Sequence, residues 1–147
     1  MIKFSRINSK YGVFSNFLPV SIVYNGIKYN STEAAWQAQK CINEKDRIKF
    51  SNMTPSQAKQ AGRRTKLRPD WENVKLNLME EICFIKFSQA PFKEILLSTG
   101  DEEIVEDTTG WHDNIWGNCS CAKCINKPGK NLLGKTLMKI RDRLKEE

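Results

Sequence analysis

The sequence contains no long apolar run, no internal repeat, no low-complexity tract and no linker rich in proline, glycine or serine. A helix needs about 20 predominantly apolar residues to cross a bilayer, so the sequence excludes a membrane-spanning segment and predicts no membrane partner. Residues 1–6 include no apolar signal region, and we therefore expect a cytoplasmic protein. Without a linker, the 147 residues are expected to form a single domain over residues 1–147.

Histidine is scarce, with one residue, and the sequence contains five cysteines. An odd number of cysteines does not suit the disulfide framework of a secreted protein. Three of the five lie within six residues: Cys119, Cys121 and Cys124. A structural zinc ion needs four N or S ligands, so the fourth would come from Cys41, Cys83 or His112. Free thiols or a redox-labile pair are the alternative to a metal site.

The charge is unbalanced towards the basic side, with a formal net charge of +7. This balance favours an anionic partner such as a nucleotide, a phosphate or a nucleic acid. The basic residues are spread along the chain, so charge alone does not identify the partner. The hydrophobic content of 39% and charged content of 28% suit a globular protein with a core and a soluble surface.

Local signals predict many helices and few strands. Short strands are expected at residues 2–7 and 103–106, and Asn25-Gly26 supplies the positive φ angles of a hairpin turn between residues 20–24 and 27–29. Helices are predicted over residues 30–43, 44–50, 56–62, 71–89, 92–97 and 134–145, and an irregular stretch over 107–130. Elements that do not alternate regularly indicate an α+β fold, here a mainly helical domain with a small sheet or β-hairpin.

The first predicted helix carries an unusual set of side chains. Asn30 is expected to cap it, and Glu33 lies three residues on, as in a capping box. Positions 33, 36, 37 and 40 share one helical face, which presents a carboxylate, an indole, an amide and an amine. Such a mixture suits a pocket wall. The alternative is an ordinary helix in which Trp36 lies in the core and Lys40 reaches solvent.

Two segments near the C-terminus are further candidates for a site. Residues 110–117 bring two tryptophans, His112 and Asp113 into one irregular loop. The alternative is a surface loop with a purely structural role, held in place by its two indoles. Residues 129–134 combine glycines and amides before a helix and can approach a phosphate, or form a simple tight entry turn.

Taken together, these segments resemble the NADAR (YbiA-like) family over nearly the whole chain. The matching stretches are residues 11–17, 29–40, 58–59, 62–63, 79–87, 97–101, 105–106, 113–117 and 129–141, and they occur in the family's order and spacing. The chain departs from the family at Ala34, where the family often has histidine.

The resemblance implies an α+β fold and N-glycosidase activity on N-linked ribosyl phosphates. Some members are similar to enzymes that clear riboflavin-pathway intermediates, and others resemble hydrolases that remove ADP-ribose from guanine in DNA. The family's catalytic acid corresponds to Glu33, its lysine to Lys40, and the aspartate before its Trp-Gly dipeptide to Asp113. The other residues expected to bind substrate are Arg6, Gly12, Asn16, Trp36, Trp116, Gly117, Lys130 and Asn131.

A mechanism follows from these residue types. Glu33 is predicted to transfer a proton, while the Lys40 amine attacks C1 of the opened ribose to form a Schiff base that water resolves. The lysine then needs a lowered pKa, from burial or from a cationic neighbour such as Arg63 or Arg64. Asp113 is expected to orient the sugar hydroxyls or to assist proton transfer. No cofactor is required.

The expected roles of the binding residues are less specific. Trp36 or Trp116 would stack on the base, and Arg6, Asn16 and Lys130 would contact phosphate. The substrate is predicted to be an ADP-ribosyl or ribosyl-phosphate adduct, most favourably ADP-ribosylated DNA, and no protein partner is expected. A riboflavin-pathway ribosylaminopyrimidine phosphate and a non-catalytic ADP-ribose or nucleic-acid reader remain as alternatives.

Overall fold

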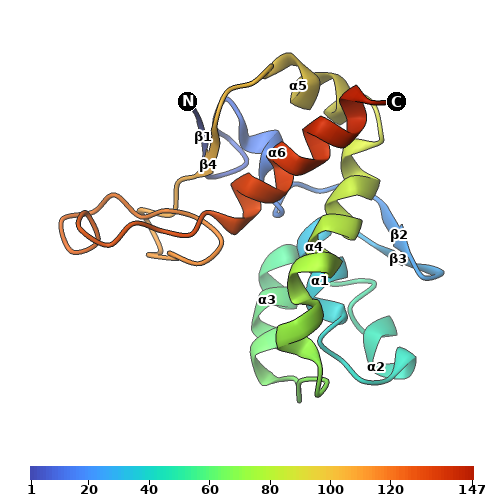
Figure 1. The fold of residues 1–147 in the computed structure, drawn as a ribbon. Coiled ribbons are helices and arrows are strands. Elements are labelled where there is room, and N and C mark those ends of the chain that lie inside the picture. The colour runs from blue at the N-terminus through green and yellow to red at the C-terminus, as the bar shows by residue number, and fades with distance from the viewer. The chain divides into compact units, whose positions relative to one another are not determined.

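The structure is a computed structural model that describes residues 1–147. Its helices are α1 (Thr32–Ala38), α2 (Glu44–Ile48), α3 (Pro55–Arg64), α4 (Trp71–Phe87), α5 (Phe92–Ser98) and α6 (Leu132–Lys145), with a short 3₁₀ helix η1 (Gly12–Phe14). Its strands are β1 (Ile2–Phe4), β2 (Ile22–Tyr24), β3 (Ile27–Tyr29) and β4 (Ile104–Glu106). The predicted α+β fold is therefore confirmed (Figure 1).

The chain divides into two compact units, one of residues 16–86 and one of residues 1–15 with 87–147. That they act together as one domain stays a prediction. No helix has the length and apolar character that crossing a membrane requires.

The unit of residues 16–86 begins with the predicted hairpin. Strands β2 and β3 pair antiparallel, with Ile22 opposite Tyr29. The turn residues Asn25 and Gly26 have φ angles of 49° and 81°, as a two-residue turn of this type requires. The side chains of Ile22 and Tyr29 are fully buried. The Asn-Gly signal thus determined both the turn and the register of the strands.

Helix α1 is shorter than predicted at both ends. Its N-cap is Ser31, whose hydroxyl accepts the Ala34 N–H, and Glu33 is therefore not the partner in a capping box. Asn30 still belongs to the hairpin, since its carbonyl accepts the Val20 N–H. The helix ends at Ala38 rather than near residue 43.

Two arginines explain this early end. The Lys40 carbonyl accepts the Arg68 N–H at 2.9 Å. The guanidinium of Arg47 donates to the carbonyls of Cys41 and Ile42. These donors satisfy carbonyl groups that a longer helix would have bonded internally.

Helices α3 and α4 follow their sequence signals closely. Thr54 and Gln57 form a complete capping box before α3, with Pro55 in the first turn. Helix α3 packs against α1, and Ala58 and Gly62 lie on its buried face. Helix α4 buries Trp71 within this unit. The end of α1 therefore lies among residues of α3 and of the start of α4.

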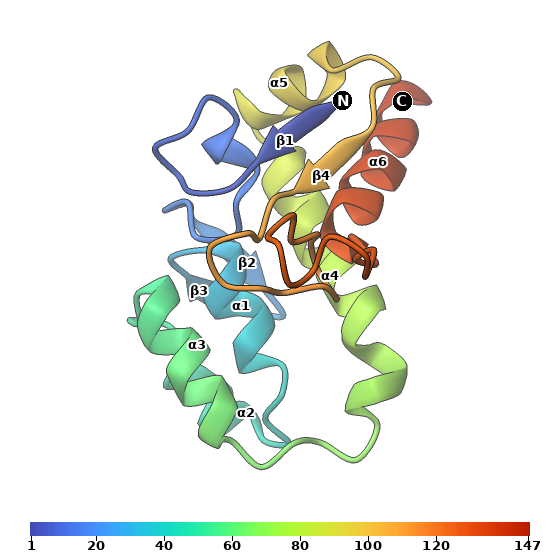
Figure 2. The ribbon, with the colours of Figure 1, turned by 90° about the vertical axis from the view of Figure 1, so that its left-hand side faces the viewer.

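The second unit is built on β1 and β4, which pair parallel with Ile2 opposite Ile104. Figure 2 shows the two strands side by side, with α6 next to β4. The predicted strand at residues 2–7 ends at Phe4, because the chain turns at Arg6, whose carbonyl accepts the Ser9 N–H. The Phe4 ring packs edge-on against Phe14. Residues 107–130 are irregular, as predicted, apart from turns and one isolated bridge between Asp107 and Asn118.

Candidate active site

Glu33 lies in the first turn of α1 and is almost fully buried, with 7% of its surface exposed. One carboxylate oxygen accepts a hydrogen bond from Gln37 Nε2 at 3.0 Å, one helical turn further along. The Glu33 backbone N–H donates to the Asn16 carbonyl, which fixes the start of the helix. The carboxylate is therefore held in one place within the protein.

Lys40 lies in the turn that follows α1, where its N–H donates to the Gln37 carbonyl. Its ammonium group lies over two indole rings, 5.4 Å from the centroid of Trp36 and 5.8 Å from that of Trp71. The rings pack on each other at 5.1 Å with a tilt of 54°. Trp71 is 31 positions further along the chain, and sequence analysis gave it no role at the site.

The surroundings of Lys40 lower its pKa, the condition that the Schiff-base mechanism sets. Burial is the largest cause, because it disfavours the charged amine. The Glu33 carboxylate opposes this effect, and the positive charge of Arg63 adds to it. Of the two arginines considered from sequence, Arg63 is thus the one that acts on the amine. An acid and a partly desolvated amine lie within electrostatic reach of each other.

Helix α3 closes this site with Gly62. A Cβ atom at position 62 would lie 1.9 Å from Gln37 Oε1 and 3.4 Å from Lys40 Nζ, so no larger residue fits without a shift. Gln37 Oε1 is itself buried and has no hydrogen-bond partner. A buried acceptor without a donor costs free energy.

Trp36 and Asn16 are directed into the protein. Trp36 is 7% exposed, and its indole N–H donates to the Lys75 carbonyl at 3.0 Å. The Asn16 side chain accepts a hydrogen bond from the Thr32 hydroxyl and contacts Met79 Sδ. Trp36 thus packs against the Lys40 amine, and the Asn16 carbonyl accepts the Glu33 N–H. Their predicted roles in base stacking and phosphate binding stay predictions.

Asp113 belongs to the other unit and organises its own loop. Its Oδ1 accepts the N–H groups of Ile115 and Trp116 at 2.9 and 3.0 Å, and its carbonyl accepts the Thr108 hydroxyl. Trp116 is half-buried. The carboxylate thus shapes the turn before Trp116, and its part in the chemistry stays a prediction.

The remaining predicted binding residues lie in the same unit. Arg6 and Lys130 are exposed. Asn131 is buried in a left-handed conformation with φ 51°, and its side chain bonds the backbone at both ends of β4. Gly12 and Gly117 lie where a Cβ atom would be 2.2 Å from the Ile7 carbonyl oxygen and 2.3 Å from Thr108. These two glycines and Asn131 have structural reasons for their identity.

Two further features emerged only from the structure. Lys86 in α4 is fully buried, and burial lowers its pKa to about 8. Sequence analysis included Lys86 in a family stretch but gave it no role. The single histidine, His112, lies beside the three clustered cysteines of its loop. That group of side chains is the one candidate metal centre identified, and it lies in the unit of residues 1–15 and 87–147.

The chain is similar in sequence to known proteins over nearly its whole length. The NADAR domain model matches residues 3–145. N-glycosidase Npun_R5314 of Nostoc punctiforme is 38% identical, over 98% of this chain and 92% of its own. N-glycosidase YbiA of Escherichia coli is 36% identical, over 98% and 88%. The Riboflavin biosynthesis protein VVA0006 of Vibrio vulnificus is 32% identical over 99% of this chain, which spans 39% of that longer protein.

The fold agrees with a solved relative. The NMR structure of YbiA from E. coli matches with a TM-score of 0.85 at 34% identity, covering 99% of this chain and 84% of the other. At 34% identity the two chains are similar in sequence as well as in fold. The chain therefore belongs to the NADAR domain family, among relatives that are N-glycosidases, which are hydrolases of N-glycosyl bonds.

Proposed function

We propose that this protein hydrolyses the C1′–N bond of an ADP-ribosyl adduct, with ADP-ribose on a guanine base of DNA as its preferred substrate. One observation carries the proposal. The amine of Lys40 lies over Trp36 and Trp71 with a lowered pKa, and the buried carboxylate of Glu33 lies within electrostatic reach of it. A protein that only holds a phosphate has no need of a carboxylate beside an anionic ligand.

In the proposed reaction, Lys40 supplies the nucleophile. The ribose ring opens and the neutral amine adds to C1, after which the C1–N bond to the base breaks and leaves a protonated Schiff base between Nζ and C1. The departing base nitrogen takes up a proton. Water then adds to C1, the amine leaves, and the freed ribose carries oxygen where the base had been. The lowered pKa raises the fraction of neutral amine available for the first step.

Glu33 is the proton carrier in this scheme. Its buried carboxyl group gives a proton to the ring oxygen or to the leaving nitrogen and recovers it from the attacking water. Gln37 holds the carboxylate through its amide N–H. For Asp113, the family resemblance implies a role in orienting the sugar.

The charge pattern favours a nucleic-acid substrate. Arg63, Arg64 and Lys66 are exposed at and just beyond the C-terminal end of α3, the helix that packs on α1. Exposed basic side chains next to a reacting amine can bind backbone phosphates, and each such contact adds salt-dependent affinity. The net charge of +7 acts in the same direction.

A second candidate function is supported by one relative. The Vibrio protein that aligns with 99% of this chain is named for riboflavin biosynthesis. The same acid and amine can cleave the C1′–N bond of a small ribosylaminopyrimidine phosphate. In that case the basic residues of α3 would contribute little to turnover.

The substrate test compares two substrates in parallel. Release of ADP-ribose from an ADP-ribosylated guanine oligonucleotide should be faster than cleavage of a free ribosylaminopyrimidine phosphate. The preference for the oligonucleotide should fall as salt is raised, because the phosphate contacts are screened. Turnover of the small nucleotide alone would contradict the proposed substrate and support a function in the riboflavin pathway. Tight binding of both substrates without any product would show that the protein is a non-catalytic binding module.

Replacing Gly62 by Ala is expected to lower kcat/KM by about 100-fold, the cost of a small misplacement in an active site. The new Cβ displaces the Gln37 amide from its position beside Glu33 and crowds Lys40. Alanine is the better helix former by about 1 kcal/mol, so α3 itself should not unfold. The control is Gln60→Ala on the exposed face of α3. Normal activity of Gly62→Ala, measured under single-turnover conditions, would contradict this geometry.

Replacing Arg63 by Ala should move the acidic limb of the kcat–pH profile to higher pH. Arg63 holds the pKa of Lys40 down, so its removal raises that pKa and the amine becomes neutral only at higher pH. Arg63 is exposed, and screening should keep the shift below about one pH unit. Arg64→Ala is the matched control, because Arg64 does not contribute to the pKa of Lys40. An equal shift in both variants would contradict the assignment.

A further inference from the structure

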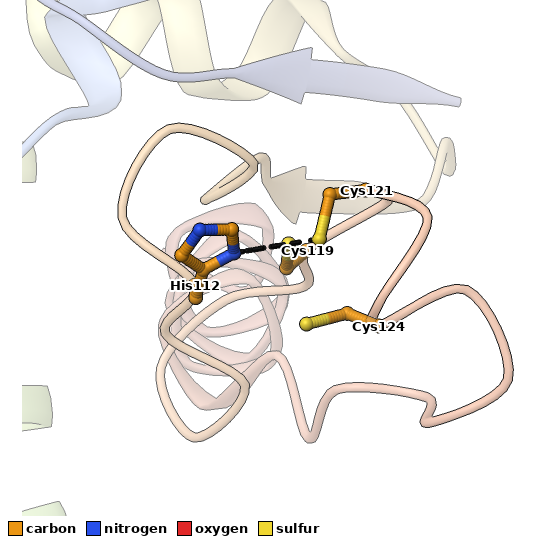
Figure 3. Close-up of side chains that lie close together, drawn as sticks. All are labelled: His112, Cys119, Cys121 and Cys124. Carbon is orange, nitrogen blue, oxygen red and sulfur yellow. Dashed lines mark hydrogen bonds between the residues drawn. The ribbon is translucent and has the colours of Figure 1, made fainter.

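Four side chains with metal-binding atoms converge in the irregular segment of residues 107–130. Their ligand atoms all lie within 4.8 Å of one another: His112, Cys119, Cys121 and Cys124. The His112 Nδ1 atom is 3.2 Å from the sulfur of Cys119 and 3.4 Å from that of Cys121. Figure 3 shows the imidazole and the three sulfurs turned towards a common point. None of these residues takes part in the proposed glycosidase chemistry.

We propose that these four side chains bind one zinc ion with a structural role. Three thiolates and an imidazole are one of the ligand sets that structural zinc takes, in a tetrahedral arrangement. Bonds of about 2.3 Å to sulfur and about 2.0 Å to nitrogen place tetrahedral ligand atoms about 3.5–3.8 Å apart. The observed separations of 3.2 and 3.4 Å differ from this by only a few tenths of an ångström. A hard cation such as Mg²⁺ or Ca²⁺ would need oxygen ligands, which this set does not contain.

Hydrogen bonds hold the backbone around the cluster in place. The Cys119 N–H donates to Asn114 Oδ1 at 2.8 Å, and the Ser120 N–H donates to the Thr109 hydroxyl at 3.1 Å. The Cys124 N–H donates to the Cys121 carbonyl at 3.0 Å and so closes a turn. Hydrogen bonds around a metal ligand help to fix its orientation. The segment between Cys121 and Cys124 thus forms a compact metal-binding turn.

His112 reaches the cysteines through an unusual backbone conformation. Its φ angle is 58°, in the left-handed region that residues other than glycine seldom adopt. Its N–H donates to the Thr108 carbonyl at 2.7 Å, which holds the residue in that conformation. Strain of this kind persists where the surrounding structure requires it, often at ligand sites. Here it aims the ring at the sulfurs.

A zinc ion at this point would support the loop that carries Asp113. His112 is the residue immediately before Asp113, and the Cys119 N–H donates to the side chain of Asn114, the residue immediately after it, at 2.8 Å. The metal would tie these two neighbours together through the cysteines. A loop of this length without regular structure gains order from such a cross-link.

The test measures metal in the full chain, purified in reducing buffer without a metal-affinity tag. Mass spectrometry of the metal content should give one zinc per chain, and Co²⁺ substitution should give the visible bands of tetrahedral cobalt bound to thiolates. Cys121→Ser and Cys124→Ser should lose most of the zinc. His112→Asn, which tolerates a positive φ, should weaken zinc binding by at least about tenfold. Ser120→Ala, an exposed neighbour between two ligands, should keep the full amount.

Three results would overturn the proposal. One is a reduced, folded wild-type protein that neither contains zinc nor binds added Zn²⁺. Another is unchanged zinc content in both cysteine variants, with folding checked by circular dichroism. The last is a disulfide among the three cysteines in protein whose thiols were blocked at lysis. These readouts do not depend on glycosidase activity, so they are independent of the proposed function.

Discussion

Replacing Lys40 by Ala should reduce the rate of base release at least about 1,000-fold, the scale seen when a catalytic nucleophile is removed. The amine lies over two indoles at the end of α1, and its pKa is lowered by burial and by Arg63. No other group at this site offers a neutral amine to C1 of the ribose. Lys40→Arg should be equally inactive, because a guanidinium remains protonated and cannot form a Schiff base.

Borohydride trapping gives a second, independent measurement of the same prediction. The wild-type protein under turnover should gain the mass of one reduced ribosyl adduct, and peptide mapping should locate it on Lys40. Lys59→Ala is the matched control, since Lys59 also lies over an aromatic ring, 5.8 Å from the centroid of Phe17. An adduct that persists in Lys40→Ala would contradict the assignment. Peptide mapping would then show which other lysine carries the adduct, and Lys86 is the other lysine with a lowered pKa.

The second large effect is expected for Glu33→Gln, with a loss of about 100- to 10,000-fold in kcat, the usual contribution of a general acid or base. The amide keeps the size of the side chain and can still accept the hydrogen bond from Gln37. It cannot carry a proton to the leaving base. The loss should therefore appear in kcat, with little change in the free energy of unfolding measured by urea denaturation.

The same variant also predicts a direction for the pH profile. The Glu33 carboxylate raises the pKa of Lys40, so its neutralisation should lower that pKa further. Any residual activity should then extend to lower pH than in the wild type, the opposite of the shift expected for Arg63→Ala. Glu44→Gln, at an exposed carboxylate outside the site, is the control. Full activity of Glu33→Gln would remove this residue from the chemistry.

Features that depend on a few adjacent residues could be predicted from the sequence. Asn25-Gly26 requires positive φ angles, and the structure has the hairpin at that point. Thr54-Pro55 predicts the start of α3, which begins there with a full capping box. In these cases the physical cause lies within one turn of the chain, in a dihedral preference or a cap.

The bounds of α1 show where this reasoning stops. Asn30 and Ser31 are both good caps, and pairing of Asn30 with Val20 in the hairpin region decides in favour of Ser31. The early end of α1 depends on Arg68, which bonds the Lys40 carbonyl from 28 residues away. A local pattern contains no information about such partners.

The sequence by itself determined the α+β class, the hairpin and most helix starts, since these follow from residue type and spacing along short segments. It also pointed to Glu33 and Lys40 through the family resemblance, and their roles stay predictions. Tertiary structure alone decided what surrounds them. It brought Trp71 beneath Lys40, Gly62 against Gln37, and His112 to the three cysteines. The reason is physical: the pKa of a buried amine and the completion of a metal-binding set depend on distances between groups far apart in the chain, and packing of the folded protein sets those distances.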